Sequence, residues 1–245
     1  MNREDLIPLD GIGFSTLMNI SKAHRLNTWM FESIQPHLNG KILEIGSGIG
    51  NLSSILVEHK TPLYLSDYNQ EYCRFLEKKF AHTAIIKGIF RIDLVDKAFE
   101  STHAHLLGTF NTIFSLNVIE HIENDQLAIE NCYKLLAPGG RLIILMPAYP
   151  ALYNRFDKEL GHCRRYTRRS INQLLSAHFR VTQTKYFNSA GIFGWFLFGS
   201  LLRQKKITGK HMDIFEKLVP LFRLADKITA SKIGLSVIGV GEKPV

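Results

Sequence analysis

Cysteine is scarce in this sequence, and the few cysteines form no ligand or disulfide pattern. Cys73, Cys132 and Cys163 are widely spaced, with no Cys-x-x-Cys pair and no Cys/His ligand spacing. A disulfide framework needs paired cysteines, and a structural zinc site needs clustered cysteines and histidines. The sequence therefore supports neither a disulfide framework nor a metal site, and it indicates a reducing compartment, which we expect to be the cytoplasm.

Long apolar runs, linkers and repeats are also missing. The strongest apolar run, residues 189–202, is shorter than the roughly 20 residues that a spanning helix needs, so we expect no transmembrane segment. Residues 1–5 are charged and no apolar stretch follows them, which argues against a secretory signal. Because no Pro/Gly/Ser-rich stretch divides the chain, we expect a single domain over residues 1–245.

A glycine-rich loop, by contrast, is present directly after a short apolar strand. Residues 42–50 read Ile-Leu-Glu-Ile-Gly-Ser-Gly-Ile-Gly, in which Gly46, Gly48 and Gly50 alternate with other residues. Glycine permits a turn with positive φ and lets a ligand approach the backbone, so this loop is predicted to hold a nucleoside. A dinucleotide loop reads Gly-x-Gly-x-x-Gly, whereas here the third glycine comes one residue early. Glu44 would repel a pyrophosphate but suits the ammonium of a methionyl group, which favours S-adenosylmethionine over NAD.

The next strand-like segment supports the same cofactor. Residues 62–67, Pro-Leu-Tyr-Leu-Ser-Asp, form an apolar run that ends in a carboxylate 21 positions after Gly46. An acidic residue at this distance reaches ribose hydroxyls in a βαβ unit, so Asp67 is the predicted ribose ligand. Tyr68 could lie beside the adenine or pack on the next helix. With strand, glycines and carboxylate together, the sequence resembles a class I S-adenosylmethionine-dependent methyltransferase.

Strand-like and helix-period segments alternate along the chain, as in folds with a parallel sheet. The resemblance implies an α/β, Rossmann-like, doubly wound sheet of the class I methyltransferase type, mostly parallel with a C-terminal antiparallel strand. N-terminal helices over residues 1–40 would cover the site, and an insertion after strand five, within 147–225, would contain the acceptor site and a lid. We expect strands near 41–45, 62–67, 83–88, 111–116, 140–146 and 234–243, and helices that begin near 50, 69, 92, 123 and 170, the last one capped by Ser170.

Three further segments extend the resemblance over nearly the whole chain. Residues 116–125, Leu-Asn-Val-Ile-Glu-His-Ile-Glu-Asn-Asp, are similar to the fourth-strand motif of many class I methyltransferases. Residues 146–166 resemble a bacterial subgroup with Pro-Ala…Asp…Gly-His-x-Arg-Arg-Tyr, from which Cys163 departs, and residues 24–29 resemble a segment before the first strand of that subgroup. The resemblance implies that Asp93 accepts a hydrogen bond from the adenine amine. The full set of implied cofactor-binding residues is Arg25, Trp29, Glu44, Gly46, Ser47, Gly48, Asp67, Tyr68, Asp93, Asn117 and Val118.

Methyl transfer from a sulfonium needs an in-line acceptor and, for a hydroxyl or a protonated amine, a base. The base should lie beyond strands four and five, toward which the sulfonium end of the cofactor would point. His121 could alternatively fix its loop by a hydrogen bond, and His162 could anchor the insertion to a backbone carbonyl. The titratable candidates are His121, Asp157 and His162, with Tyr149, Tyr153 and Tyr166 as orienting groups.

Positive charge gathers in the same part of the chain. The formal net charge is +8, and residues 153–170 hold six basic residues against two acidic ones. Arginine binds carboxylates and phosphates in bidentate geometry, so Arg164 and Arg165 favour a small anionic acceptor, such as an acidic or nucleotide-linked sugar. Some of the arginines in this span could instead pair with Asp157 and Glu159 or with helix C-termini, and Arg168 and Arg169 could lie on a solvated face. The basic residues do not alternate with aromatic ones, which argues against nucleic acid as the partner.

The apolar run 189–202 has two interpretations. It could cover the sheet or the acceptor site as a lid, or it could meet a lipid-linked acceptor or the partner in a homodimer, the alternative being a monomer. Apolar residues on all sides of a helix favour burial, and Asn188 before the run could reach the acceptor. The expected function is methyl transfer to an O or N atom of a small molecule. A non-methylating cyclase or lyase that uses the same cofactor, and a non-catalytic cofactor-binding protein, stay open as alternatives.

Overall fold

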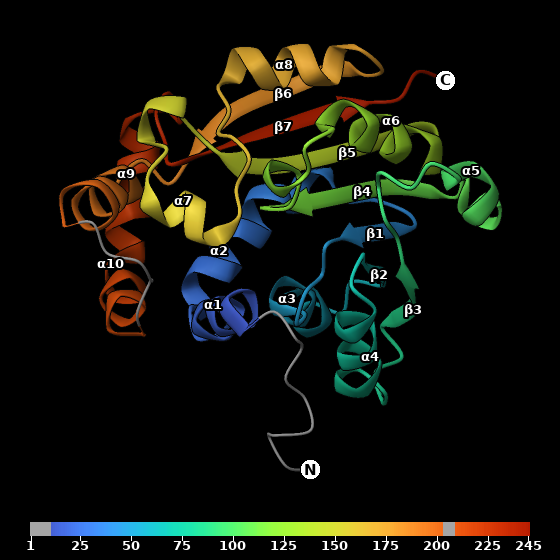
Figure 1. The fold of residues 1–245 in the computed structure, drawn as a ribbon, viewed down its shortest axis with the longest axis horizontal. Coiled ribbons are helices and arrows are strands. Elements are labelled where there is room, and N and C mark those ends of the chain that lie inside the picture. The colour runs from blue at the N-terminus through green and yellow to red at the C-terminus, as the bar shows by residue number, and fades with distance from the viewer. Residues whose placement is uncertain (1–10, 203–208) are drawn as a thin grey trace.

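The computed structural model describes residues 11–202 and 209–245, and in this part of the chain seven strands form one sheet (Figure 1). The strand order is β3-β2-β1-β4-β5-β7-β6. All neighbouring pairs among the first five strands are parallel, whereas β7 is antiparallel to both β5 and β6. The expected mostly parallel, doubly wound sheet is therefore confirmed. The strands are β1 Ile42–Ile45, β2 Leu63–Asp67, β3 Ile86–Arg91, β4 Phe110–Leu116, β5 Leu136–Pro147, β6 Arg180–Phe187 and β7 Ser236–Glu242.

Helices lie on both faces of the sheet, with α6 and α8 on one face and α2 and α3 on the other (Figure 1). A 3-10 turn, η4 (Ile119–His121), follows β4, and a π-helical turn, η6 (Phe196–Leu201), follows α9. The α-helices are α1 Gly11–Ser21, α2 His24–Ile34, α3 Asn51–Glu58, α4 Gln70–Lys79, α5 Phe99–Thr102, α6 Asp125–Leu135, α7 Arg155–Leu160, α8 Arg168–Ser176, α9 Gly191–Trp195 and α10 Gly209–Ile228.

The period of two along β5 divides the core into two layers. Leu142 and Ile144 pack in the cluster that includes α6 and α8, whereas Ile143 and Leu145 pack in the cluster that includes α2 and α3. Successive side chains of a strand point to opposite faces, so a strand that is covered on both faces reads as a continuous apolar run. All four side chains are at most 1% exposed, which fixes β5 in the centre of the molecule.

Two strand predictions need correction. Strand three is Ile86–Arg91 rather than 83–88, and β6 is absent from the expected elements. Among the described residues, β6 lies at the edge of the sheet and pairs only with β7. One side of it remains open to solvent, and its sequence, Arg-Val-Thr-Gln-Thr-Lys-Tyr-Phe, is accordingly polar in its first six positions apart from Val181.

The helix expected to begin near residue 92 is wrong. Asp93 instead accepts a hydrogen bond from the N–H of Val95, and Asp96 accepts one from the N–H of Ala98, so residues 92–98 form successive turns. Aspartate side chains compete with the helix for backbone N–H groups in this way. Helical structure is limited there to the four residues of α5.

The segment between β5 and β6, in which the sequence shows little periodicity, contains two capped helices. Asn154 and Asp157 form a reciprocal capping box at the start of α7. α8 begins after Thr167, whose hydroxyl accepts a hydrogen bond from the N–H of Ser170 at 3.1 Å, while Ser170 Oγ accepts one from the N–H of Thr167. Ser170 is therefore the third residue of α8. The prediction that Ser170 caps this helix is wrong, because Thr167 is the cap.

Candidate functional site

The glycine loop and Asp67 form one hydrogen-bonded unit at the carboxyl ends of β1 and β2. Gly46, Gly48 and Gly50 have φ angles of 73°, 53° and 73°, a region that side chains other than glycine rarely adopt. The N–H of Gly48 donates to Asp67 Oδ2 at 2.9 Å, and the N–H of Ser47 donates to the carbonyl of Ser66 at 2.8 Å. A carboxylate is thereby held beside a backbone wall without side chains, which fits a nucleoside ribose.

The loop after β4 packs directly on the glycine loop. A Cβ atom added to Gly46 would lie 2.4 Å from Val118 Cγ2, which leaves no room for any side chain at position 46. Asn117, the residue before Val118, has a φ of 55°, and its N–H donates to the carbonyl of Leu145 on β5. The structure thus brings the expected residues after β1 and β4 into contact, through backbone conformations that are specific to this turn.

Glu44 is buried beneath the loop, with 5% of its surface exposed. Burial raises the pKa of this carboxyl to about 7, while hydrogen bonds from Ser53 and Ser47 and the charge of Lys79 oppose the rise. Ser53, in the first turn of α3, donates its hydroxyl to Glu44 Oε2. Lys79 donates to the carbonyls of Ile49 and Gly50, so it also closes the end of the loop. Glu44 is therefore a carboxyl whose ionisation a nearby cation can change.

The adenine-side candidates lie where strands β2 and β3 end. Tyr68 follows β2 and is 66% exposed, so it lies at the surface next to Asp67. Asp93 follows β3 and is exposed, but one of its oxygens is used by the N–H of Val95. The contact of Asp93 with an adenine amine stays a prediction.

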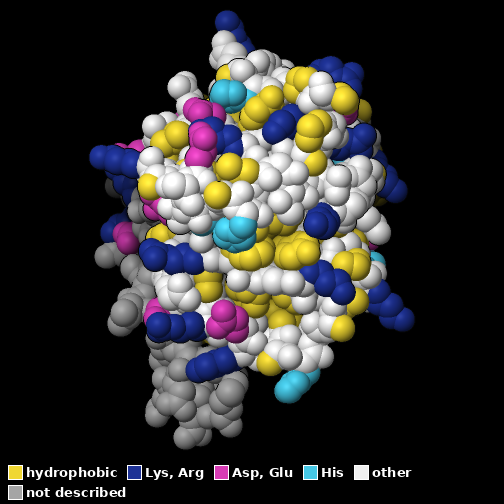
Figure 2. Space-filling view, turned by 90° about the vertical axis from the view of Figure 1, so that its right-hand side faces the viewer, with side chains coloured by type: hydrophobic (Ala, Val, Ile, Leu, Met, Phe, Trp, Pro, Cys, Tyr) yellow, Lys and Arg dark blue, Asp and Glu magenta, His cyan; other side chains and the backbone are white. Residues whose placement is uncertain are grey.

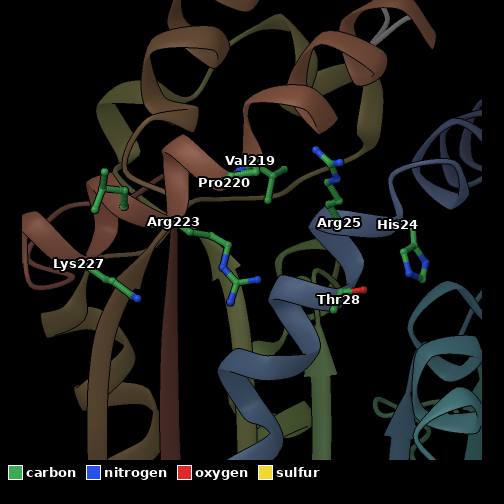
Figure 3. A pocket seen from close by; sticks show the side chains of 8 residues that line it. His24, Arg25, Thr28, Val219, Pro220, Arg223 and Lys227 are labelled. Atoms are coloured by element: carbon green, nitrogen blue, oxygen red, sulfur yellow. The ribbon is translucent and has the colours of Figure 1, made fainter.

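Arg25 and Trp29 both lie on α2 but contact different elements. The ring of Trp29 is buried against Phe187 of β6, with centroids 4.3 Å apart. Arg25 is exposed, and its N–H donates to Glu216 Oε2 on α10 at 2.9 Å. A pocket of about 510 Å³ opens between α2 and α10 at this point, and Figure 3 shows that Arg25, Arg223 and Lys227 line it from the two helices.

α1 lies over the glycine loop from the N-terminal side. The carbonyl of Leu17 accepts a hydrogen bond from the side chain of Asn51, the first residue of α3, and a Cβ atom on Gly48 would lie 3.0 Å from Leu17 Cδ1. α1 therefore contacts both the glycine loop and the start of α3.

Asp157 is the centre of a buried network in the segment that the sequence assigns to the acceptor. Asp157 Oδ1 accepts hydrogen bonds from His162 Nδ1 and Arg165 Nε, both at 2.8 Å. Arg165 also donates to the carbonyl of Ala148 at 2.8 Å, and its guanidinium lies over the ring of Trp195 at 4.6 Å. Burial alone would raise the pKa of Asp157, but the bond from His162 and the charge of Arg165 together lower it. The pairing of an arginine with Asp157, which the sequence leaves open, is present.

The other residues of this segment are also held by the protein. Tyr153 donates its hydroxyl to the carbonyl of His162, and Tyr166 donates its hydroxyl to Asp125 Oδ2. Arg164 pairs with the same Asp125 at 2.9 Å and donates to the carbonyl of Glu123. Their contact with an acceptor stays a prediction, since these bonds tie the insertion to the loop after β4.

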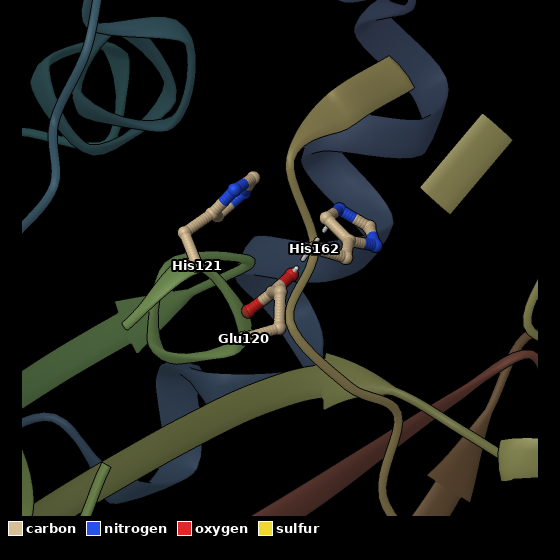
Figure 4. Close-up of side chains that lie close together, drawn as sticks. All are labelled: Glu120, His121 and His162. Atoms are coloured by element: carbon tan, nitrogen blue, oxygen red, sulfur yellow. Dashed lines mark ion pairs between the residues drawn. The ribbon is translucent and has the colours of Figure 1, made fainter. Parts of the chain in front are cut away.

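Glu120, His121 and His162 come together at the end of η4 (Figure 4). Burial raises the pKa of Glu120 to about 8, with a smaller opposing effect of its own backbone N–H and of Arg165. The surrounding protein and the neighbouring His162 lower the pKa of His121 to about 4, although part of the residue is exposed. The two imidazole rings meet edge to face, with centroids 4.8 Å apart. At neutral pH His121 is therefore neutral, with a nitrogen lone pair.

The apolar run after Asn188 differs from expectation. Asn188 is buried and uses its side-chain oxygen to accept the N–H of Gly191 at the start of α9. The run is packed on one side only, because Phe193 and Leu201 are 74% and 66% exposed. The expectation of burial on all sides is wrong, since a π-helical turn follows α9 and the segment lies at the edge of the molecule.

Sequence reasoning did not single out Ser53, Lys79 or Glu120. Ser53 occurs among apolar residues on a buried helical face, a weak signal in the sequence. Lys79 reaches the glycine loop from the last turn of α4, which only the packing of α4 on the sheet reveals. Glu120 belongs to the fourth-strand motif, but its burial cannot be read from the motif.

A family model described as a methyltransferase domain matches residues 22–183, which is more than half of the chain. The chain belongs to this methyltransferase family. A methyltransferase domain with this glycine loop and fold uses S-adenosylmethionine as its cofactor. The unit formed by the glycine loop and Asp67 fits that molecule.

Curated relatives of the methyltransferase match over about half of its length. It is 24% identical over 123 residues to a ubiquinone biosynthesis O-methyltransferase of Erwinia tasmaniensis, with 49% of each protein covered. It is 30% identical over 148 residues to probable polyketide synthase 1 of Dictyostelium discoideum, where the match covers 50% of the chain but 5% of that protein. The chain thus spans a small part of the polyketide synthase and about half the length of the O-methyltransferase.

Solved structures share the whole fold of the methyltransferase. One is a methyltransferase in complex with the Haloferax volcanii Trm112 activator, with a TM-score of 0.62, 12% identity and 95% and 96% of the two chains covered. Another is the phosphoethanolamine N-methyltransferase 2 of Haemonchus contortus with phosphomonomethylethanolamine and S-adenosylhomocysteine. Its TM-score is also 0.62, at 14% identity, with 100% of this chain and 61% of that chain covered. These likenesses establish the fold.

Proposed function

We propose that this methyltransferase transfers the methyl group of S-adenosylmethionine to an O or N atom of a small anionic acceptor. The observation that carries the proposal is the unit formed by the glycine loop, Asp67 and the loop after β4. In it, Asp67 faces a backbone wall, and Gly46 packs on Val118 with no space for a side chain. Asp67 would bind the ribose hydroxyls, and Glu44 would face the ammonium of the methionyl group.

The acceptor atom that receives the methyl group would lie beside η4, at the exposed side of His121, while its anionic group would bind in the pocket between α2 and α10. In parallel α/β sheets ligands bind outside the carboxyl ends of the strands, and His121 follows β4 by a single short turn. Because His121 is neutral at physiological pH, it offers a lone pair to whatever binds there. Asp157, His162, Arg165 and Tyr166 are positioning residues in this proposal, since their hydrogen bonds hold the insertion against this edge of the sheet.

Support for an anionic acceptor comes from the pocket between α2 and α10 rather than from Arg164 and Arg165. Arg25, Arg223 and Lys227 line it, and guanidinium groups suit phosphate and carboxylate. The structurally similar phosphoethanolamine N-methyltransferase binds a phosphorylated amine, an acceptor of this charge. On the side of the molecule near α5, by contrast, Lys and Arg are dispersed (Figure 2), which does not favour the continuous basic surface that nucleic acid would need.

Product analysis tests the reaction. The enzyme is incubated with S-adenosylmethionine and a panel of phosphorylated or carboxylated amines and alcohols, each next to its neutral analogue. We expect S-adenosylhomocysteine to form with an anionic member and not with its neutral analogue. Methylthioadenosine as the product would favour the cyclase or lyase, and cofactor binding with no product from any acceptor would favour the non-catalytic protein.

A variant pair tests the pocket. Arg223→Gln should raise the KM for the anionic acceptor about tenfold, because one charge-assisted contact is lost. The affinity for S-adenosylmethionine should not change. Arg168→Gln, at the exposed start of α8, is the matched control and should behave as the parent enzyme. Equal KM values for both variants would place the acceptor elsewhere.

We further propose contact with a lipid surface through the outer side of α9 and α10. Large hydrophobic side chains are exposed there, and those of α10 recur every three or four residues, which is one helical face. Of the helices in the described part of the chain, none is long and apolar enough to cross a bilayer, so this contact would be peripheral. The exposed side chains are Phe193, Phe196, Leu201, Leu202, Ile214, Leu218, Leu221, Leu224, Ile228 and Ile233.

A further inference from the structure

The carboxylate of Glu120 is buried without a hydrogen-bond partner. The residue is 0% exposed, and neither of its side-chain oxygens has a partner among the described residues. His162 Nε2 lies 4.0 Å from Glu120 Oε1, which is too far for a hydrogen bond. A buried carboxylate in this condition costs several kcal/mol unless something binds it, and native proteins rarely leave such a group unpaired.

The hydrogen bond at the other nitrogen of His162 fixes where its lone pair points. Asp157 Oδ1 also accepts a hydrogen bond from Arg165 Nε, as a carboxylate paired with a guanidinium does, so His162 Nδ1 carries the hydrogen of the 2.8 Å bond to Asp157. In the neutral ring Nε2 then carries the lone pair, and this atom faces Glu120. A carboxylate that holds one nitrogen of a histidine while the other faces a second ligand is the usual support of a metal-binding histidine.

A third donor completes the cluster. One donor atom from each of Glu120, His121 and His162 lies within 4.8 Å of the others, and Figure 4 shows the three side chains converging from η4 and from the segment after α7. Arg165 is paired with Asp157, whereas Glu120 is approached by His162 Nε2 at 4.0 Å and makes no side-chain hydrogen bond among the described residues. Two imidazole rings and one carboxyl group without a hydrogen bond therefore lie close together.

We propose that Glu120, His121 and His162 bind one divalent first-row transition-metal ion. Two imidazole nitrogens and one carboxylate are a ligand set of zinc and of iron, manganese or cobalt sites with open positions. Bonds of about 2.0 to 2.2 Å require the donors to approach by roughly 1 Å from their present separation, and His121, which is partly exposed, can make most of that movement. The open positions face the solvent side of His121, where water or an acceptor oxygen binds.

The experiment measures metal binding directly, without cofactor or acceptor, so that it is independent of the proposed reaction. Untagged full-length protein is stripped with a chelator and titrated with Co²⁺ and, separately, with Zn²⁺ by calorimetry. Metal per chain is then determined by mass spectrometry after gel filtration. We expect one ion per chain for either metal, and bound Co²⁺ should show the visible absorption of a site with nitrogen ligands.

Three variants distinguish this site from adventitious binding. Glu120→Gln keeps the shape of the buried side chain, and His121→Gln alters a partly exposed residue, so both should fold, which circular dichroism checks. Each should weaken Co²⁺ binding by at least about tenfold. His82→Gln, an exposed histidine in the turn after α4, is the matched control and should bind as the parent does. The proposal is overturned if the parent protein binds no ion, or if all three variants bind with the affinity of the parent.

Discussion

Asp67 is the residue whose removal should affect the cofactor most directly. Its carboxylate is held in place by the N–H groups of Gly48 and Asn69, each at 2.9 Å, and would accept hydrogen bonds from the ribose. Asp67→Ala should lower the affinity for S-adenosylmethionine by about 1.5 to 3 kcal/mol for each charge-assisted bond lost. Calorimetry measures this effect, with Asp213→Ala on the exposed side of α10 as the control. Unchanged affinity would remove Asp67 from the site.

Glu44 should couple cofactor binding to protons. Its pKa in the unliganded protein is raised to about 7, mainly by burial, so the carboxyl is largely protonated below that pH. The ammonium of the methionyl group favours the ionised form, and binding should therefore release a proton near pH 7 and weaken as the pH falls below it. Calorimetry in buffers of different ionisation enthalpy detects the released proton.

The Glu44→Gln variant provides the control for this effect. It cannot ionise, so its affinity should be lower but independent of pH over the same range. A parent protein whose affinity does not change across pH 7 would contradict this role of Glu44.

The raised pKa of Glu44 also has a consequence for the unliganded fold. Because the folded pKa exceeds that of the unfolded chain, the contribution of Glu44 to stability is present below about pH 4.5 and is lost as the pH rises through about 7.

At the level of elements, the insertion between β5 and β6 contains a buried ion pair. Asp157 in α7 and Arg165, eight residues later, are 0% and 5% exposed. Asp157→Ala would leave the guanidinium buried without its partner, and it should lower the free energy of unfolding by about 3 to 5 kcal/mol. Urea unfolding followed by circular dichroism measures the loss.

Arg165→Lys separates a clamp from an acceptor contact. A lysine keeps the charge but cannot donate both to Asp157 Oδ1 and to the carbonyl of Ala148, as Arg165 does. The structure leads us to expect a clear loss of stability, and a loss of turnover only in proportion to the unfolded fraction. A stable variant with little turnover and normal cofactor affinity would instead show that Arg165 contacts the acceptor.

The sequence predicts the cofactor half of the molecule better than the acceptor half, for a physical reason. Gly46 and Gly48 adopt a positive φ, and Asp67 ends a strand. These are local features, which the residue types at these positions indicate directly. Arg165 depends on the fold instead, because only the turn between α7 and α8 directs it inward to Asp157. The unpaired state of Glu120 is a property of everything packed around it, and no local pattern expresses that.

At the scale of the whole molecule, most of the large hydrophobic side chains that are exposed among the described residues lie on α9, η6 and α10. We expect the protein to sediment with vesicles that contain anionic lipid, because Lys217 and Lys227 lie on the same helix as the apolar face. Leu221→Ser with Leu224→Ser should reduce the bound fraction several-fold at unchanged stability, since both side chains are more than half exposed. The control substitution is Thr182→Ser, at an exposed position of β6.

Gel filtration of the same double variant decides between lipid and a second copy of the chain. If the apolar face joined two protomers, the parent protein would elute as a dimer and the variant as a monomer, and vesicles would not matter. Binding to vesicles by a monomeric parent protein supports the lipid contact. If the protein fails to sediment with vesicles of any charge, the proposed lipid contact is wrong.

The position of β7 has a consequence for how the chain is made on the ribosome. β6 joins the sheet only through β7, and β7 lies between β5 and β6 although it is synthesised after both. Until residues 236–242 have been translated, β6 has no partner and the outer edge of β5 is open, which exposes the nascent chain to aggregation. A premature stop codon before residue 236 would therefore remove two strands from the sheet, although it deletes the coding sequence of only one.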